Sequence, residues 1–129
     1  MFGKKKEEEP TPMMRAMAKA FFALTDKQDY ATAASSYREA YQLCGTSTVK
    51  ELGLRAEICF GYGHALRLLY DLEAISPRRP PTEAQEKAMV QVNRVWTELL
   101  DIVSRIPADA YRLDANLIDQ IRKHWTMSD

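Results

Sequence analysis

A sustained heptad pattern of apolar and small residues runs through residues 48–76 and restricts the possible folds of the chain. Its members alternate in steps of four and three: Leu54, Ile58, Gly61, Ala65, Leu68, Leu72 and Ile75. A second apolar line, from Cys59 to Leu69, follows the same spacing about 100° further round a helix. A helix that is apolar over so wide an arc packs against more than one neighbour. The pattern therefore predicts one long, largely buried central helix in an all-α protein.

Four further segments show helical periodicity and complete a predicted compact bundle of about five helices. The predicted ranges are 12–25, 29–44, 48–76, 82–106 and 113–126. The fourth range carries an apolar seam at heptad spacing: Ala88, Val92, Val95, Leu99, Ile102 and Ile106. Helix starts are indicated by Pro12 in a first turn, by the capping boxes Thr48-x-x-Glu51 and Thr82-x-x-Gln85, and by Asp114. Between the third and fourth helices, Pro77–Pro81 predicts a stiff, basic linker.

Helix ends are indicated by two prolines and a glycine. Pro77 is expected to end the central helix at Ser76, and Pro107 is expected to stop the fourth helix. Gly45 is expected to adopt a left-handed conformation after the second helix.

The first helix carries an apolar seam that is expected to face the core. The seam consists of Met14, Met17, Phe21 and Leu24. Phe22 and Met13 lie off this seam. We interpret them as additional core, with an exposed apolar contact for a partner as the alternative.

The composition fits one helical domain over residues 12–129, preceded by a charged tail over residues 1–11 that is expected to be disordered. Eighteen basic and eighteen acidic residues give no net charge, which weighs against nonspecific binding of nucleic acid. The two cysteines are too few for a disulfide framework and fit a reducing compartment. Because no stretch approaches about 18 uninterrupted apolar residues, we expect no transmembrane segment and a cytoplasmic protein.

Gln28-Asp29-Tyr30, followed by Ala33, Tyr37, Ala40 and Leu43, resembles the turn and second helix of a tetratricopeptide repeat. The resemblance covers about Met14–Ser47 and implies an antiparallel helical hairpin at the start of the domain. The first helix departs from the family pattern, and the segment after Thr48 does not restore it. In that family the first helix of each hairpin lines a groove for peptides, which implies Arg15, Ala18, Phe22 and Thr25 as contacts here.

No constellation of residues predicts catalysis, a metal site or a cofactor. Cys44, Cys59 and His64 lack the closely spaced ligand pairs of zinc sites. His64 could pair with Asp71 or Glu57, but residues seven apart on a helix are about 10 Å apart and do not touch. The common phosphate-binding, nucleophile and metalloprotease motifs are absent from the sequence. We therefore predict a protein that is not an enzyme.

The sequence favours a helical interaction protein, an adaptor or assembly subunit that binds another protein or peptide. Its candidate contacts are Arg15 and Phe22 on the first helix, a polar stripe on the central helix, and the paired arginines of the linker. The stripe consists of Glu57, His64, Arg67 and Asp71, and we expect it to be exposed. Arg78 and Arg79 lie in a P-x-x-P pattern and are candidates for binding phosphate or carboxylate.

Three alternatives stay open. The heptad faces could serve a homo-oligomer. The clusters Lys4–Lys6, Arg78–Arg79 and Arg122–His124 could contact nucleic acid in a nucleoprotein complex. An enzyme or ligand-binding bundle would need a buried polar pocket that the sequence does not indicate.

Overall fold

The computed structural model describes residues 10–124, and within that range it contains five α-helices and two short 3₁₀ turns but no β-strand. The elements are α1 (Pro12–Thr25), α2 (Tyr30–Leu43), α3 (Val49–Leu69), η2 (Leu72–Ala74), α4 (Glu83–Val103), η3 (Ala108–Ala110) and α5 (Ala115–His124). The predicted all-α bundle is confirmed. The predictions for residues 1–9, for the end of the last helix at 126 and for the side chain of His124 lie outside the described part of the chain.

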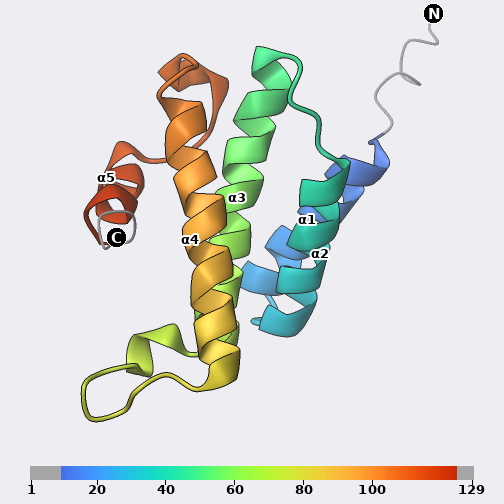
Figure 1. The fold of residues 1–129 in the computed structure, drawn as a ribbon. Helices are drawn as coiled ribbons and strands as arrows, with labels where there is room; N and C mark the ends of the chain where they lie inside the picture. The colour runs from blue at the N-terminus through green and yellow to red at the C-terminus, as the bar shows by residue number, and fades with distance from the viewer. Residues whose placement is uncertain (1–9, 125–129) are drawn as a thin grey trace, which may run out of the picture.

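Figure 1 shows how the helices are arranged around α3. α3 and α4 run side by side in opposite directions through the middle, the hairpin of α1 and α2 packs on one side, and α5 lies against α4 on the other. Because each turn reverses the chain, α1 and α3 point the same way. None of the helices described has both the length and the apolar character needed to cross a bilayer.

The central helix accepts neighbours on several sides because glycines remove side chains where those neighbours come close. A Cβ on Gly61 would lie 2.3 Å from the ring of Tyr37 on α2. A Cβ on Gly63 would lie 2.2 Å from the indole of Trp96 on α4, and one on Gly53 would lie 1.9 Å from the carbonyl of Ala110 in η3. The predicted packing of this helix against more than one neighbour is thus confirmed.

The predicted helix starts are confirmed by the caps that form them. Both capping boxes, at Thr48 with Glu51 and at Thr82 with Gln85, make their two reciprocal hydrogen bonds. Thr11 caps α1 ahead of Pro12 in its first turn, and the Asp114 carboxylate accepts a hydrogen bond from the backbone N–H of Asn116 at 3.0 Å. The predicted seam of the fourth helix is also confirmed, because its members are all buried: Ala88, Val92, Val95, Leu99, Ile102 and Ile106. α4 itself ends at Val103 and not at 106 as predicted, so Ile106 lies in the turn that follows the helix.

The predicted end of the central helix at Ser76 is wrong, because α3 ends at Leu69. Asp71 adopts a left-handed conformation with φ 53°, and the chain then folds Leu72 back into the core. The side-chain amide of Gln85, from the start of α4, donates a hydrogen bond of 2.9 Å to the carbonyl of Tyr70. This contact satisfies a carbonyl that the helix end leaves open. It comes from a residue 15 positions away, so the local pattern gives no sign of it.

The prediction that Gly45 adopts a left-handed conformation is also wrong, because no glycine among the described residues has a positive φ. The chain leaves α2 through Cys44 in an extended conformation. The guanidinium of Arg55 donates hydrogen bonds to the carbonyls of Tyr41 and Cys44, at 3.3 and 3.1 Å. An arginine from α3 therefore caps α2 in place of a glycine turn.

The first helix meets the core mainly with a different side from the one predicted, although Met17 and Leu24 of the predicted seam, and Met13, are half-buried and pack against the core. Its buried residues are the alanines Ala16, Ala20 and Ala23, which pack against α2. Phe21 of the predicted seam is 60% exposed, and Met14 is 45% exposed. Phe22 is 50% exposed, so its interpretation as additional core is wrong as well. Alanines on both helices let the two backbones approach closely, which excludes the large side chains from the contact.

Candidate functional site

An apolar groove of about 720 Å³ lies between α1, α3 and the segment from η3 to the start of α5. Its apolar walls come from three separate parts of the chain: Met14, Met17, Phe21 and Leu24 on α1, Leu54 and Phe60 on α3, and Tyr111, Leu113 and Leu117 beyond them. The volume is within the range of roughly 300–1,000 Å³ that is typical of binding sites in proteins.

The groove stays open because of the way in which α1 packs. α1 buries its alanines against α2 and touches α3 only lightly. Met14 and Phe21 therefore face the space between α1 and α3, whereas Met17 and Leu24 line this space and also pack against the core. The floor of this space includes Tyr37 and Gly61, where the tyrosine ring fits the position that a side chain would take.

Charged residues gather at the end of the groove where α3 begins. Lys50, Asp109 and Arg112 line this end and are exposed. Glu57 is half-buried, and its carboxylate accepts a hydrogen bond of 2.9 Å from the backbone N–H of Arg112. Burial, together with the charge of Glu57, raises the pKa of Tyr37 to about 12, so this phenol stays neutral at the groove floor.

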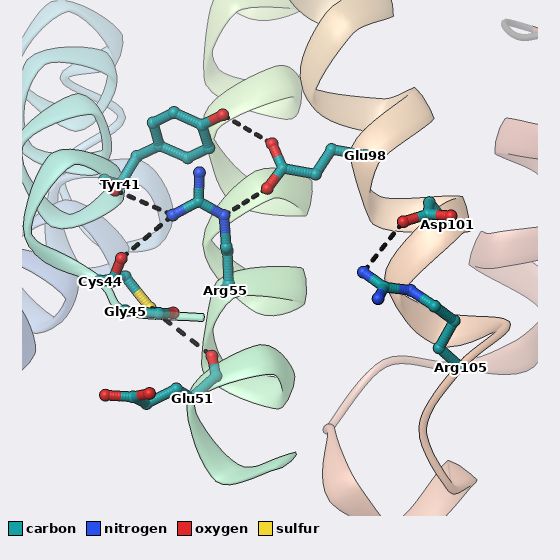
Figure 2. A network of polar contacts seen from close by, with 8 residues as sticks. All are labelled: Tyr41, Cys44, Gly45, Glu51, Arg55, Glu98, Asp101 and Arg105. Carbon is teal, nitrogen blue, oxygen red and sulfur yellow. Dashed lines mark hydrogen bonds and ion pairs between the residues drawn. The ribbon is translucent and has the colours of Figure 1, made fainter. Parts of the chain in front are cut away.

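A polar network on the other side of α3 joins α2, α3 and α4 (Figure 2). The Arg55 guanidinium forms an ion pair with Glu98, and the Tyr41 hydroxyl donates a hydrogen bond of 2.6 Å to the same carboxylate. The Arg55 guanidinium also lies 4.1 Å from the centre of the Tyr41 ring. Burial, followed by the hydrogen bond to Glu98 and its charge, raises the pKa of Tyr41 to about 12. Sequence reasoning missed this network, since its members lie 57 and 43 positions apart.

The cysteines near this network are poorly suited to nucleophilic chemistry. Cys44 and Cys59 are both free and buried. Burial is the main cause that raises the pKa of each thiol, so both stay protonated at neutral pH. Since every strong polar contact of Arg55 is to a neighbouring helix or to the end of α2, the network stabilises the packing of α2, α3 and α4.

A smaller cavity of about 390 Å³ lies where α3, α4 and α5 meet, and two of the predicted stripe residues line it. The His64 ring stacks on Phe60 with ring centres 5.8 Å apart. Arg67 forms an ion pair with Glu73 and lies 5.6 Å from the centre of the Trp96 ring. Burial, and then the charge of Arg67, lower the pKa of His64.

The predicted polar stripe is not one exposed surface. Glu57, His64 and Arg67 are half-buried, and Glu57 lines the groove whereas the other two line the smaller cavity. Asp71 is exposed but lies beyond the end of α3. The helix ends too early to carry the stripe to its predicted length.

The other predicted contacts lie apart from one another. On α1, the Arg15 guanidinium donates a hydrogen bond of 2.8 Å to the carbonyl of Pro10, and the Lys27 ammonium lies 5.7 Å from the centre of the Phe22 ring. Of the four α1 positions implied by the tetratricopeptide resemblance, the groove lining includes Ala18. It does not include Arg15, Phe22 or Thr25.

Arg78 and Arg79 are exposed in the connection between α3 and α4, near the opposite end of α3 from Lys50 (Figure 1). Ser76 and Arg79 exchange backbone hydrogen bonds of 3.0 and 2.9 Å, which fold the segment into a tight turn. The turn replaces the extended form that P-x-x-P ligands adopt. In the basic cluster that begins at Arg122, the charge of Arg122 is partly neutralised, because its guanidinium forms an ion pair with Asp119.

Between residues 10 and 124, the structure places no three His, Cys, Asp or Glu side chains in a group that could hold a metal ion. Comparison of the chain with protein-family models, with curated proteins and with solved structures finds no match. The geometry of the groove is therefore the basis for a functional proposal.

The groove residues that sequence reasoning missed are the ones assigned to the core of the first helix. A signal for the alternative existed in Ala16, Ala20 and Ala23, which are spaced by four and three and match the alanines of the second helix. The sequence of this helix therefore offers two faces that could pack into the core, the alanine face and the face that contains Phe21. The small residues fit the close hairpin better, and the large ones were left on the groove side.

Proposed function

We infer that this chain is a non-catalytic protein-binding module, an adaptor or assembly subunit, that holds its partner in the groove between α1 and α3. The main support for this proposal is that Phe21 and Met14 are exposed at an apolar groove of about 720 Å³, although they belong to a regular apolar seam. Exposed contiguous apolar surface on a soluble domain is typical of a protein interaction site. The two buried free cysteines support a reducing, cytoplasmic setting.

Adjacent phenylalanines on α1 provide a matched test of this proposal. Phe21 lines the groove and Phe22 does not, yet they are exposed by 60% and 50% and lie about 100° apart on one helix. A photo-crosslinking phenylalanine analogue is placed at one position or the other in the protein expressed in its own cells. We expect a discrete protein adduct from position 21 and none from position 22.

The control is the unfolding curve of each labelled protein, which should match that of the wild type. Equal labelling at both positions, or no adduct at position 21 in a folded protein, would contradict the proposed function.

A further inference from the structure

We propose that the smaller cavity, where α3, α4 and α5 meet, is a binding site for a small aromatic carboxylic acid whose carboxylate pairs with Arg67. The proposal goes beyond the protein-binding groove and does not depend on it. It concerns the cavity of about 390 Å³ that His64, Arg67 and Trp96 help to line. A cavity with polar groups in its wall is the feature of a ligand-binding bundle that the sequence itself does not indicate.

The wall of the cavity combines aromatic rings with a few polar groups. The rings of Phe60 and Trp96 are nearly parallel, at 12°, with centres 6.3 Å apart, and the His64 ring lies at 15° to that of Phe60. Leu117 and Ile121 of α5 add aliphatic side chains. Small-molecule sites typically have such walls, largely apolar with a few polar groups that fix the orientation of the ligand. Because aromatic rings stack on one another, this wall favours a ligand with an aromatic body.

The volume of the cavity sets the size of the ligand. At about 390 Å³, it is near the lower end of the range of roughly 300–1,000 Å³ that is typical of ligand sites. A cavity of about 150 Å³ suffices for a benzene-sized group, so room remains for a second ring and for a carboxylate. The cavity therefore fits a small acid with one or two rings.

Two arginines of α3 differ in how their charge is compensated. Arg55 pairs with Glu98, whose side chain is 28% exposed, and also donates hydrogen bonds to two carbonyls at the end of α2. Arg67 pairs with Glu73, whose side chain is 68% exposed. Solvent screens the charge of a carboxylate in such a position. Arg67 therefore lines a cavity while its ion-pair partner lies largely in solvent.

The pKa values of the two side chains reflect this difference. Burial disfavours the charged form of Arg55, but the hydrogen bond and the charge of Glu98, with smaller contributions from other neighbours, outweigh burial and raise the pKa. Burial lowers the pKa of Arg67, so the charge of Glu73 does not offset the loss of solvent there. A carboxylate inside the cavity is less exposed to solvent than Glu73 and pairs more strongly with the guanidinium.

The ion pair with Glu73 also indicates which anion suits this site. Burial, and then the charge of Arg67, lower the pKa of His64, so the imidazole is neutral at neutral pH and Arg67 supplies the positive charge of the wall. A ligand carboxylate takes the place of the Glu73 carboxylate, which moves fully into solvent. The exchange keeps the net charge of the site, and it makes Glu73 a competitor of the ligand.

The test is a calorimetric titration of the folded full chain with naphthylacetate and, as a matched probe without charge, with the corresponding amide. The variants are Arg67→Gln, Glu73→Gln and Phe21→Ala. Glu83→Gln is the control for Glu73→Gln, because Glu83 is also an exposed glutamate in an ion pair but lies outside the cavity wall. Urea unfolding establishes that each variant is folded.

We expect the wild type to bind the acid at least about tenfold more tightly than the amide, because hydrogen bonds between charged groups are the stronger ones. Arg67→Gln should remove this preference. Glu73→Gln should tighten the binding of the acid by roughly two- to fivefold, since the ligand no longer competes with an exposed carboxylate. Glu83→Gln and Phe21→Ala should leave the affinity unchanged.

Each contrary outcome overturns the proposal. Loss of binding with Phe21→Ala would place the acid in the groove. Equal affinities for the acid and the amide would exclude the pairing with Arg67, and this comparison stands even where Arg67→Gln does not fold. Binding that Glu73→Gln leaves unchanged or weakens would show that this glutamate does not compete for the site. No binding of the acid at millimolar concentration would overturn the site itself, whereas the protein-binding groove would be unaffected.

Discussion

The α1–α2 hairpin and the α3–α4 pair solve the same packing problem in opposite ways. The hairpin brings its helices together through alanines such as Ala20 and Ala33, both fully buried, and leaves its phenylalanines outside. The α3–α4 pair buries large side chains, above all Trp96, in spaces that glycines leave open. Small residues facing small ones free the large side chains for another role, whereas large residues facing glycines use them for stability.

This difference explains why α1 contributes large apolar side chains to the candidate groove. Most apolar side chains of α3 and α4 are buried in the core or packed against it. Those on α1 are available at the groove, because the close approach of α1 to α2 does not need them. A residue's effect on stability should therefore depend on which of the two packing modes it belongs to.

The largest expected effect is the truncation of Trp96, which would break the large-side-chain packing of α3 and α4. Trp96 is 2% exposed and stacks on Phe60, with ring centres 6.3 Å apart. Trp96→Ala should lower the free energy of unfolding by about 3–5 kcal/mol. Urea unfolding followed by circular dichroism measures the change. A loss below about 1 kcal/mol would contradict the packing described here.

The next effect tests the hairpin by enlarging a side chain. Ala20→Leu should destabilise the protein by about 1–3 kcal/mol, because the close approach of α1 to α2 leaves no room for extra methylene groups. Ala18→Leu is the matched control on the same helix. Ala18 is exposed, so this change should be nearly neutral. Equal unfolding midpoints for the two variants would disprove the alanine-packed contact.

A smaller effect on stability tests whether Gly63 is needed because it leaves room for a neighbouring side chain. Gly63→Ala would place its Cβ 2.2 Å from the Trp96 indole nitrogen, and the ring would have to move. The overpacking costs about 1–3 kcal/mol, from which the better helix propensity of alanine, up to about 1 kcal/mol, must be subtracted. We therefore expect a net destabilisation at position 63. If alanine stabilised the protein, the indole would not occupy that space.

A thermodynamic cycle controls the interpretation of the Gly63 variant. Combined with Trp96→Phe, the Gly63→Ala change should destabilise less than it does alone, since a smaller ring makes room for the new Cβ. Strict additivity of the two changes would place the clash elsewhere.

The smallest effect is a pH dependence of the stability of the protein, which arises from His64 where α3, α4 and α5 meet. The folded protein disfavours protonation of His64, through burial first and the charge of Arg67 second, so the pKa of His64 is below its value of 6.5 in the unfolded chain. The unfolded chain thus takes up the proton first as the pH falls, and stability is lost below about pH 6.5. The urea midpoint of the wild type should fall more between pH 7.5 and 5.5 than that of His64→Gln. Parallel pH profiles would contradict the shifted pKa.

Local sequence signals predicted the helix starts and the core of α4 because the same few residues both encode and form them. Thr48 with Glu51, and Thr82 with Gln85, make their capping contacts within four residues. The seam around Leu99 has no competitor on α4. On α1, in contrast, the alanine seam and the Phe21 seam have the same period, and only the identity of the neighbouring helix decides between them.

The end of α3 and the candidate site were beyond prediction from local patterns for a common reason. The apolar seam continues through Leu72, so only the distant Gln85 and the left-handed Asp71 reveal the break. The groove likewise needs three segments that are far apart in the chain. Because this surface forms only when α1 packs against α2, no contiguous sequence motif encodes it.

The light contact of α5 with α4 has a consequence for hydrogen exchange. Backbone amides exchange through local opening, and a helix that few contacts hold opens before the core does. Amides of α5 should therefore exchange earlier than those of α3, which has neighbours on several sides. Leu117 carries the third wall of the groove on this same helix. A ligand that fills the groove would then be seen as slower deuterium uptake in α5, a helix far from Phe21 in the sequence.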